Sequence, residues 1–223
     1  MTNARLIGLP QRLNVPAHAY SALLLSLLGL WLLAPFLSML DFEEATSAFL
    51  ITVTIVAASY AMANQGKSFW LVIGLGVLFA IGTWVDASGL EFEVGVWSAT
   101  TGALFYGVVA YEMLVDILSK KSRVDMHLIN GAIAVYLLIG ICFAYIYALI
   151  FWFDDGAFRG IAEDVDSGTE FVYFSFVTLT TLGYGDVTPV TVWGESLAIV
   201  GQIYLTVLVA RLVGIHISQA STS

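Results

Sequence analysis

The stretch Thr178-Leu-Thr-Thr-Leu-Gly-Tyr-Gly-Asp186 decides the fold of this chain. It has one glycine on each side of a tyrosine, and it lies between two long apolar segments. Glycine adopts positive φ at almost no cost, whereas a residue with a Cβ loses about 1–2 kcal/mol there. When alternate residues have positive φ, successive carbonyl groups point to the same side of the backbone. We therefore expect residues 181–185 to form a non-helical segment whose backbone oxygen atoms can surround a cation.

A Gly-Tyr-Gly turn on the surface of a soluble protein is the simpler interpretation of the tripeptide alone. The composition argues against it, because the 223 residues are 59 % apolar and only 11 % charged, with a mean hydropathy of +0.90. Soluble domains of this length carry more charge. We therefore predict an all-α integral membrane protein. The single cysteine, Cys142, lies in an apolar run, which excludes an intrachain disulfide and indicates a small structural side chain.

Apolar runs of about 20 residues, the length that crosses a hydrocarbon core of about 30 Å, recur along the chain. We predict six transmembrane helices, at Ala17–Leu40, Ala45–Ala63, Phe69–Val85, Val94–Leu118, Leu128–Phe153 and Val192–His216. The first is too long for a cleaved signal peptide. The run from Glu170 to Thr180 is too short to span and is predicted to be a re-entrant pore helix. Residues 182–189 must then be non-helical, which is tolerated at membrane depth only beside a wet cavity or inside protein.

The charged residues predict the orientation of these helices. Seven of the eight Lys and Arg residues fall on one side of the predicted spans, with Arg159 as the exception, and acidic residues dominate the loops of the other side. Because basic loops stay in the cytoplasm, we expect both termini on the cytoplasmic side of the membrane. The net charge of −9 then reflects an acidic outer face and indicates no nucleic-acid partner.

In the segments 173–189 and 204–214 the chain resembles the tetrameric potassium channel superfamily. The strongest part is Tyr-Phe-Ser-Phe-Val-Thr-Leu-Thr-Thr-Leu-Gly-Tyr-Gly-Asp-Val-Thr-Pro at 173–189, followed by Tyr-Leu-Thr-Val-Leu-Val-Ala-Arg-Leu-Val-Gly at 204–214. The pore half, approximately Leu128 to Ile217, is similar to small bacterial channels of the two-helix pore type. The four preceding helices match six-helix voltage-gated channels by arrangement only. The resemblance implies a homotetramer in a bacterial plasma (inner) membrane, surrounded by membrane lipids, that conducts K⁺ passively.

The resemblance also implies roles for individual residues. Backbone carbonyls of the selectivity filter would coordinate K⁺, contributed by Thr181, Leu182, Gly183, Tyr184 and Gly185. Asp186 would lie at the outer mouth, and Tyr173 occupies the pore-helix position at which relatives have an aromatic residue that hydrogen-bonds this aspartate. An interfacial aromatic anchor is the alternative for Tyr173. Some relatives have a glutamate behind the filter, but Val177 stands there, so no buried carboxyl pair is expected.

The predicted inner helix departs from the pattern of the family. Relatives often have a hinge glycine 19 residues after the filter aspartate, where this chain has Leu205, and Gly201 lies about one turn earlier. Gly201 is either a displaced hinge or a site of close helix packing, and we favour packing. The same alignment predicts that the cavity below the filter, or the gate of that cavity, is lined by Thr206, Val209 and Val213.

Two acidic residues, Glu112 and Asp116, lie one turn apart near the cytoplasmic end of the fourth predicted span. Acidic residues at membrane depth indicate function, here a proton sensor or a contact with the pore. The alternative, which we favour, is an interfacial ion-pair ladder that includes Lys120. The fourth span contains no Lys or Arg, so we expect opening to depend at most weakly on voltage.

These inferences divide the chain into five segments. They are a cytoplasmic N-terminal segment at 1–16, a four-helix transmembrane domain at 17–118, a cytoplasmic linker at 119–127, a pore domain at 128–217 and a short cytoplasmic tail at 218–223. We expect no nucleotide- or calcium-binding module after the last span. No hydrolase triad, zinc-ligand set or phosphate loop is present, so we expect no enzyme and no cofactor besides permeant K⁺.

Two other functions remain as alternatives. One is a subunit of a K⁺ uptake system or transporter; such chains usually contain four degenerate pore repeats, whereas this one has a single full Thr-Leu-Gly-Tyr-Gly. The other is a non-conducting membrane subunit that modulates a partner channel. The intact filter sequence argues against it.

Overall fold

The computed structural model describes residues 18–37, 43–63, 67–88, 95–119, 126–161 and 167–220. For some of these residues it describes the backbone alone: 34, 35, 37, 43, 44, 67, 127, 167, 209 and 211–220. The predicted N-terminal segment 1–16 lies outside the described residues. So do residues 120–125 of the predicted linker and the last three residues of the predicted tail.

Helices form most of the described chain. They are α1 (Ala19–Leu37), α2 (Glu43–Ala61), α3 (Lys67–Asp86), α4 (Gly95–Ser119), α5 (Met126–Phe153), α6 (Ser167–Leu179) and α7 (Val192–Ala220). The 3₁₀ turn η1 (Asp155–Ala157) follows α5, and β1 (Phe158–Arg159) pairs antiparallel with β2 (Thr188–Pro189). The predicted pore helix is therefore present as α6, and each predicted span is present as a helix. The pairing of β1 with β2 was not predicted. Helix α7 continues past the predicted end at His216, because no glycine or proline follows to stop it.

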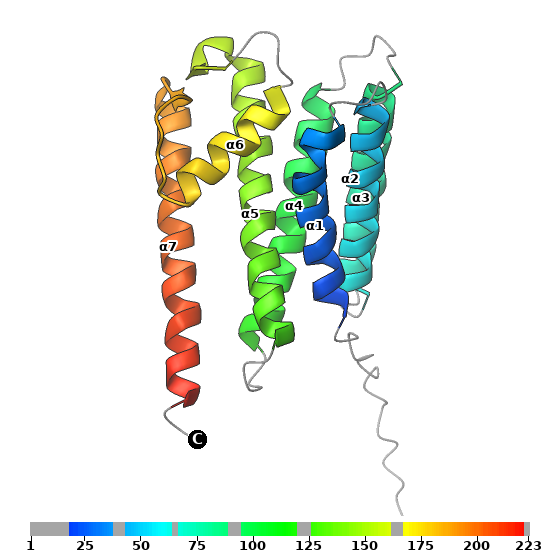
Figure 1. Cartoon of the computed structure of the whole chain (residues 1–223), viewed down its shortest axis with the longest axis vertical. Coiled ribbons are helices and arrows are strands. Elements are labelled where there is room, and N and C mark those ends of the chain that lie inside the picture. Colours follow the sequence, from blue (N-terminus) through cyan, green and yellow to red (C-terminus); the bar gives the residue numbers. More distant parts are fainter. Residues whose placement is uncertain are drawn as a thin grey trace, which may run out of the picture.

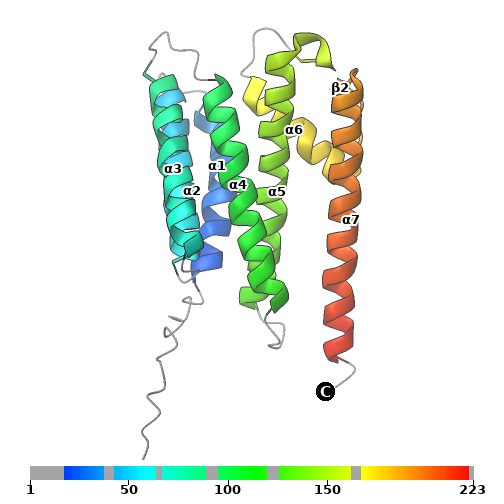
Figure 2. The ribbon, with the colours of Figure 1, turned by 180° about the vertical axis from the view of Figure 1, so that it is seen from behind.

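The helices run side by side along one axis, with α6 as the exception (Figure 1). Helix α4 packs along α5, and α1 also contacts α5, so that α1–α4 form a bundle on one side of it. Figure 2 shows α4 between α3 and α5 from behind. Helix α6 slopes between α5 and α7, beginning at the end of the bundle where β1 and β2 lie, which we call the sheet end. Helix α1 begins and α7 ends at the opposite end (Figure 1).

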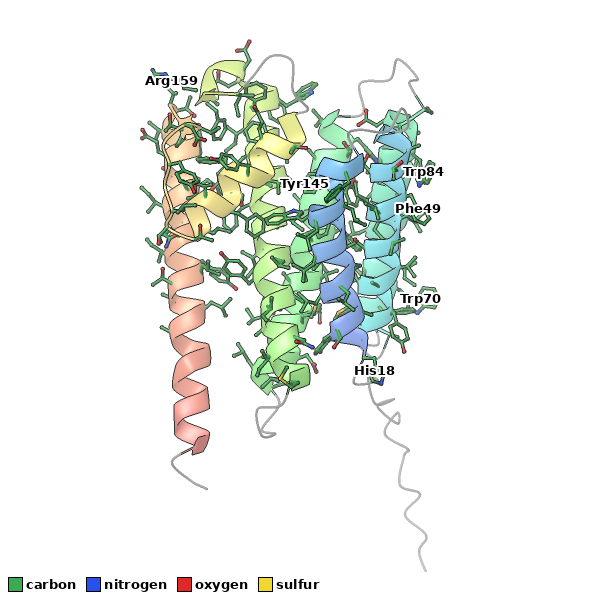
Figure 3. All side chains as sticks on the ribbon, in the orientation of Figure 1. His18, Phe49, Trp70, Trp84, Tyr145 and Arg159 are labelled. Atoms are coloured by element: carbon green, nitrogen blue, oxygen red, sulfur yellow. The ribbon has the colours of Figure 1, made fainter. Side chains whose placement is uncertain are left out.

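Three helical stretches of the described chain are long and apolar enough to cross a membrane: Ser68–Asp86, Gly95–Ser119 and Leu128–Phe153. The other three predicted spans are present as shorter apolar stretches, at Ala19–Leu33, Ala45–Ala61 and Val192–Leu208. Large aromatic side chains such as Phe49, Trp70 and Trp84 point away from the bundle on its outer side (Figure 3), and Trp70 is 72 % exposed. Apolar surfaces of this kind suit contact with lipid, and tryptophan is enriched at membrane interfaces.

Two buried clusters hold the elements together. The larger one joins the four-helix bundle to α5 and includes the fully buried rings of Tyr20, Phe79 and Phe105. The smaller one lies at the sheet end around Tyr147 of α5 and joins η1, β1 and α6. Cys142 lies between α4 and α5, where its Sγ donates to the carbonyl of Ala103 at 3.3 Å. This contact is consistent with the structural role expected for the cysteine.

Candidate functional site

The loop that follows α6 has positive φ at every second residue. The values are +61° at Thr181, +59° at Gly183 and +78° at Gly185. Thr181 is the one residue other than glycine with positive φ in the described chain, and such strain in a residue with a Cβ usually marks a functional site. The predicted alternation is therefore confirmed. It turns successive carbonyl groups of residues 181–185 toward one side of the loop.

The loop begins where α6 ends, because carbonyl groups of the last helical turn hold it. Val177 accepts from the backbone N–H groups of Leu182 at 3.0 Å and Gly183 at 3.2 Å, and Thr178 accepts from that of Thr181 at 3.0 Å. These bonds reverse the chain so that it returns toward the sheet end. The side chain of Val177 is buried. Residues 182–189 are non-helical, as predicted.

Asp186 ends the loop at the sheet end and is held through both carboxylate oxygen atoms. Tyr173 of α6 donates its hydroxyl to Oδ2 at 2.5 Å, and the backbone N–H of Val187 donates to Oδ1 at 3.0 Å. The hydrogen bond from Tyr173 and the one from Val187 lower the pKa of Asp186, with Tyr173 having the larger effect. The hydrogen bond that the sequence suggested for Tyr173 is therefore present.

Helix α6 is docked on α5 at Gly140. Ser175 is fully buried and donates its hydroxyl to the Gly140 carbonyl at 2.7 Å. The ring of Phe176 fills the space beside Gly140, where a Cβ would lie 2.2 Å from the ring. Trp31 of α1 meets the other side of Phe176 edge-on, with ring centroids 4.1 Å apart. No sequence signal identified these contacts, since each joins segments far apart in the chain.

Helix α7 contacts the rest of the site through Gly201 and Gln202. A Cβ at Gly201 would lie 3.1 Å from the ring of Phe143 on α5, which favours the packing interpretation over the hinge. With its nitrogen facing α6, the Gln202 amide donates to the carbonyl of Thr178 at 2.8 Å and to that of Leu179 at 3.3 Å. Gln202 therefore binds carbonyl groups at the C-terminus of α6. Sequence reasoning did not identify it.

The predicted cavity residues are described only in part. Thr206 is exposed and donates its hydroxyl to the carbonyl of Gln202 at 2.8 Å, within the same helix. Leu205, at the position of the hinge glycine in relatives, is buried. The side chains of Val209 and Val213 lie outside the described residues.

The two acidic residues of α4 bind hydroxyl groups of neighbouring helices. Ser68 of α3 donates to Glu112 Oε1 at 2.8 Å, and Tyr20 of α1 donates to Asp116. Lys120, the base of the expected ion-pair ladder, lies outside the described residues. The structure thus gives each carboxylate a hydroxyl partner near the end of the bundle opposite the sheet end.

Comparison with known proteins adds one finding. Residues 135–219 match a family model described as an ion channel. The matched region includes most of α5, all of α6 with the loop that follows it, and nearly all of α7. No curated protein and no solved structure matches the chain. The match supports an ion channel function for a part of the chain that contains the loop 181–185, Tyr173 and Asp186.

Proposed function

We propose that four copies of this chain form a potassium-selective channel that conducts K⁺ passively across a bacterial plasma membrane. In this assembly the carbonyl groups of Thr181 to Gly185 replace the hydration shell of K⁺ on a central axis. Asp186 and Tyr173 lie at the outer mouth. The cavity below the filter is lined from α7, with Thr206 among its residues.

The observation that carries this proposal is the alternation of positive φ at Thr181, Gly183 and Gly185. It supports coordination by backbone oxygen atoms, because a run of carbonyl groups on one side of a strand can replace water around a dehydrated K⁺. The ion channel match over residues 135–219 supports it independently.

The incomplete surroundings of the loop support an assembly of several chains, for which we propose a tetramer. Each chain supplies a single filter loop, whereas a closed ring of carbonyl groups needs several. Leu182 is 55 % exposed and Tyr184 67 % exposed in one chain. Helix α7 also exposes large apolar side chains, including Trp193 and Val207. Neighbouring subunits would cover these surfaces.

The remaining segments fit a six-span arrangement with a four-helix domain at 17–118 and a pore domain at 128–217. The start of α1 and the end of α7 lie at the same end of the bundle, which is consistent with both termini in the cytoplasm (Figure 1). Arg159 lies at the opposite, sheet end, and His18 at the end where α1 begins (Figure 3). We assign the sheet end to the outside.

Ion flux into liposomes tests the proposal. The purified protein should carry K⁺ far faster than Na⁺, and Gly183→Ala should abolish K⁺ flux or its selectivity, because a Cβ is disfavoured at a φ of +59°. Gly74→Ala on α3 is the matched control, since a Cβ there meets no atom within 4 Å. Equal fluxes of the two ions through the unmodified protein would refute the proposal.

A further inference from the structure

The segment before α6 touches the backbone at the end of the filter loop. Gly160 has a φ of +89°, and a Cβ built on it would lie 1.9 Å from the carbonyl oxygen of Asp186 and 3.3 Å from the Cα of Val187. Any side chain at this position would therefore displace the backbone of Asp186. Glycine is required here for two reasons, the close approach and the left-handed backbone.

The same segment is tied to the chain that follows the loop. Phe158 pairs with Pro189 and Arg159 with Thr188 in the two-stranded sheet. One residue beyond, the backbone N–H of Val190 donates to the carbonyl of Ala157 at 2.8 Å. We call the segment 157–160, together with its pairing to 188–190, the strap.

The strap is anchored by packing against α5 and α6. The ring of Phe158 is buried in the smaller cluster, edge-on to Tyr147 of α5 and to Phe171 and Phe174 of α6. Gly194 at the start of α7 allows Pro189 to approach, since its Cβ would lie 2.9 Å from that of Pro189. The strap thus connects α5 and α6 with the segment between Asp186 and α7.

Beside the strap, the outer end of the loop is held by the two hydrogen bonds of the Asp186 carboxylate and by Val187, whose buried side chain packs in the smaller cluster. Helix α6 reaches Asp186 through the single hydroxyl of Tyr173, and Val177 provides no carboxyl group behind the filter. Gly183 and Gly185 have no atom within 4 Å of the position of a Cβ, so the loop itself is open on that side. The strap lies directly against the backbone of Asp186 and, with the buried Val187, limits where that backbone can lie.

We propose that Gly160 is a positioning residue for ion conduction, through which the strap holds the outer end of the filter in its conducting conformation. This inference rests on the proposed function. Gly160 does not contact the ion. It acts through the backbone carbonyl group of Asp186, because a displacement of Asp186 also moves the adjoining carbonyl groups of Tyr184 and Gly185. The filter then collapses sooner during a sustained opening.

Current decay in planar bilayers tests this role. Gly160→Ala should speed the decay of K⁺ current during a sustained opening by about tenfold, as expected for a Cβ at positive φ. Gly156→Ala in the preceding turn is the matched control, because its Cβ meets Asp154 Oδ1 at an ordinary 3.4 Å; it should decay like the unmodified protein. Equal decay rates for the two variants would refute the role of Gly160. Absence of K⁺ current from the unmodified protein would instead refute the proposed function.

A reversible cross-link tests the strap even if Gly160→Ala fails to assemble. Arg159 and Thr188 are partners in an antiparallel pair, whose Cα atoms lie about 4.5–5.5 Å apart and can accept a disulfide. In the double variant Arg159→Cys/Thr188→Cys, with the bond verified by mass spectrometry, oxidation should slow current decay several-fold. Reductant should restore the original rate, and neither single variant should respond. A verified cross-link that leaves the decay rate unchanged would overturn the proposal.

Discussion

The carboxylate of Asp186 receives a hydrogen bond at each of its two oxygen atoms, one from Tyr173 and one from the backbone of Val187. Both donors favour the ionised carboxylate. The bond from Tyr173 matters more for the loop, because it joins the end of the filter to α6, whereas the bond from Val187 is local. Removal of a single hydroxyl group, that of Tyr173, should therefore be enough to loosen the outer end of the loop.

Tyr173→Phe removes one hydroxyl and leaves the ring. We expect current decay during a sustained opening to become about two- to tenfold faster, the range for loss of one hydrogen bond. The measurement is single-channel or macroscopic recording in planar bilayers. Tyr111→Phe is the control, since that side chain lies on α4 and is exposed. A decay rate that Tyr173→Phe leaves unchanged would show that the bond does not stabilise the filter.

External pH provides a second prediction for the same pair. The pKa of Asp186 lies below its ordinary value of 3.8 in the folded chain, so the ionised carboxylate stabilises the folded loop above that value. This stabilisation is lost only as pH falls through the lowered pKa. Current decay should therefore be the same at external pH 7 and pH 5. A decay rate that rises between these two values in the unmodified protein would contradict the assignment.

At the scale of elements, the position of α6 depends on its contact with α5. The carbonyl of Gly140 accepts from buried Ser175, and the absence of a side chain at Gly140 admits the ring of Phe176. Trp31 of α1 covers the same ring. Helix α1 is therefore part of the support of the pore helix, and this contact does not involve the predicted linker 119–127.

Gly140→Ala should loosen this docking. A Cβ placed 2.2 Å from the Phe176 ring forces the ring or α6 to move, and such overpacking costs about 1–3 kcal/mol. We expect the melting temperature of the purified protein in detergent to fall by several degrees. Gly29→Ala on α1, where a Cβ meets no atom within 4 Å, should be neutral or slightly stabilising. Equal melting temperatures for the two variants would mean that the packing of α6 on α5 does not require a glycine at position 140.

The helices could be predicted from the sequence, whereas most contacts that position the filter could not. Apolar runs of membrane length predicted α1–α5 and α7, a shorter run predicted α6, and the spacing of Gly183 and Gly185 predicted positive φ at these two residues. The strands β1 and β2 have two residues each, too few for a period of alternating side chains. The contact of Gly160 with Asp186 and that of Gln202 with α6 are tertiary. No local pattern encodes them.

At the scale of the whole molecule, α1–α4 pack on one side of α5, and α4 lacks the basic residues of a voltage sensor. Helix α4 carries Glu112 and Asp116 as its charged residues and no Lys or Arg. Each of these carboxylates has a hydroxyl partner from α3 or α1, near a helix end where a moving charge would cross little of the membrane potential. The arrangement suits a support for the pore.

Voltage dependence tests this account of α1–α4. One elementary charge that crosses the membrane contributes about 2.3 kcal/mol per 100 mV, and α4 offers no basic charge to move. The conductance–voltage curve in planar bilayers should therefore be nearly flat. An apparent gating charge of several elementary charges per channel would contradict the role of α1–α4 as a support.

The reversal potential under bi-ionic conditions tests the central claim most directly. With K⁺ on one side of a planar bilayer and Na⁺ on the other, a filter of backbone carbonyl groups should pass K⁺ almost exclusively. The current through the purified protein should then reverse far from zero, at the sign set by K⁺. A reversal potential at zero would show that the loop from Thr181 to Gly185 does not select K⁺ over Na⁺.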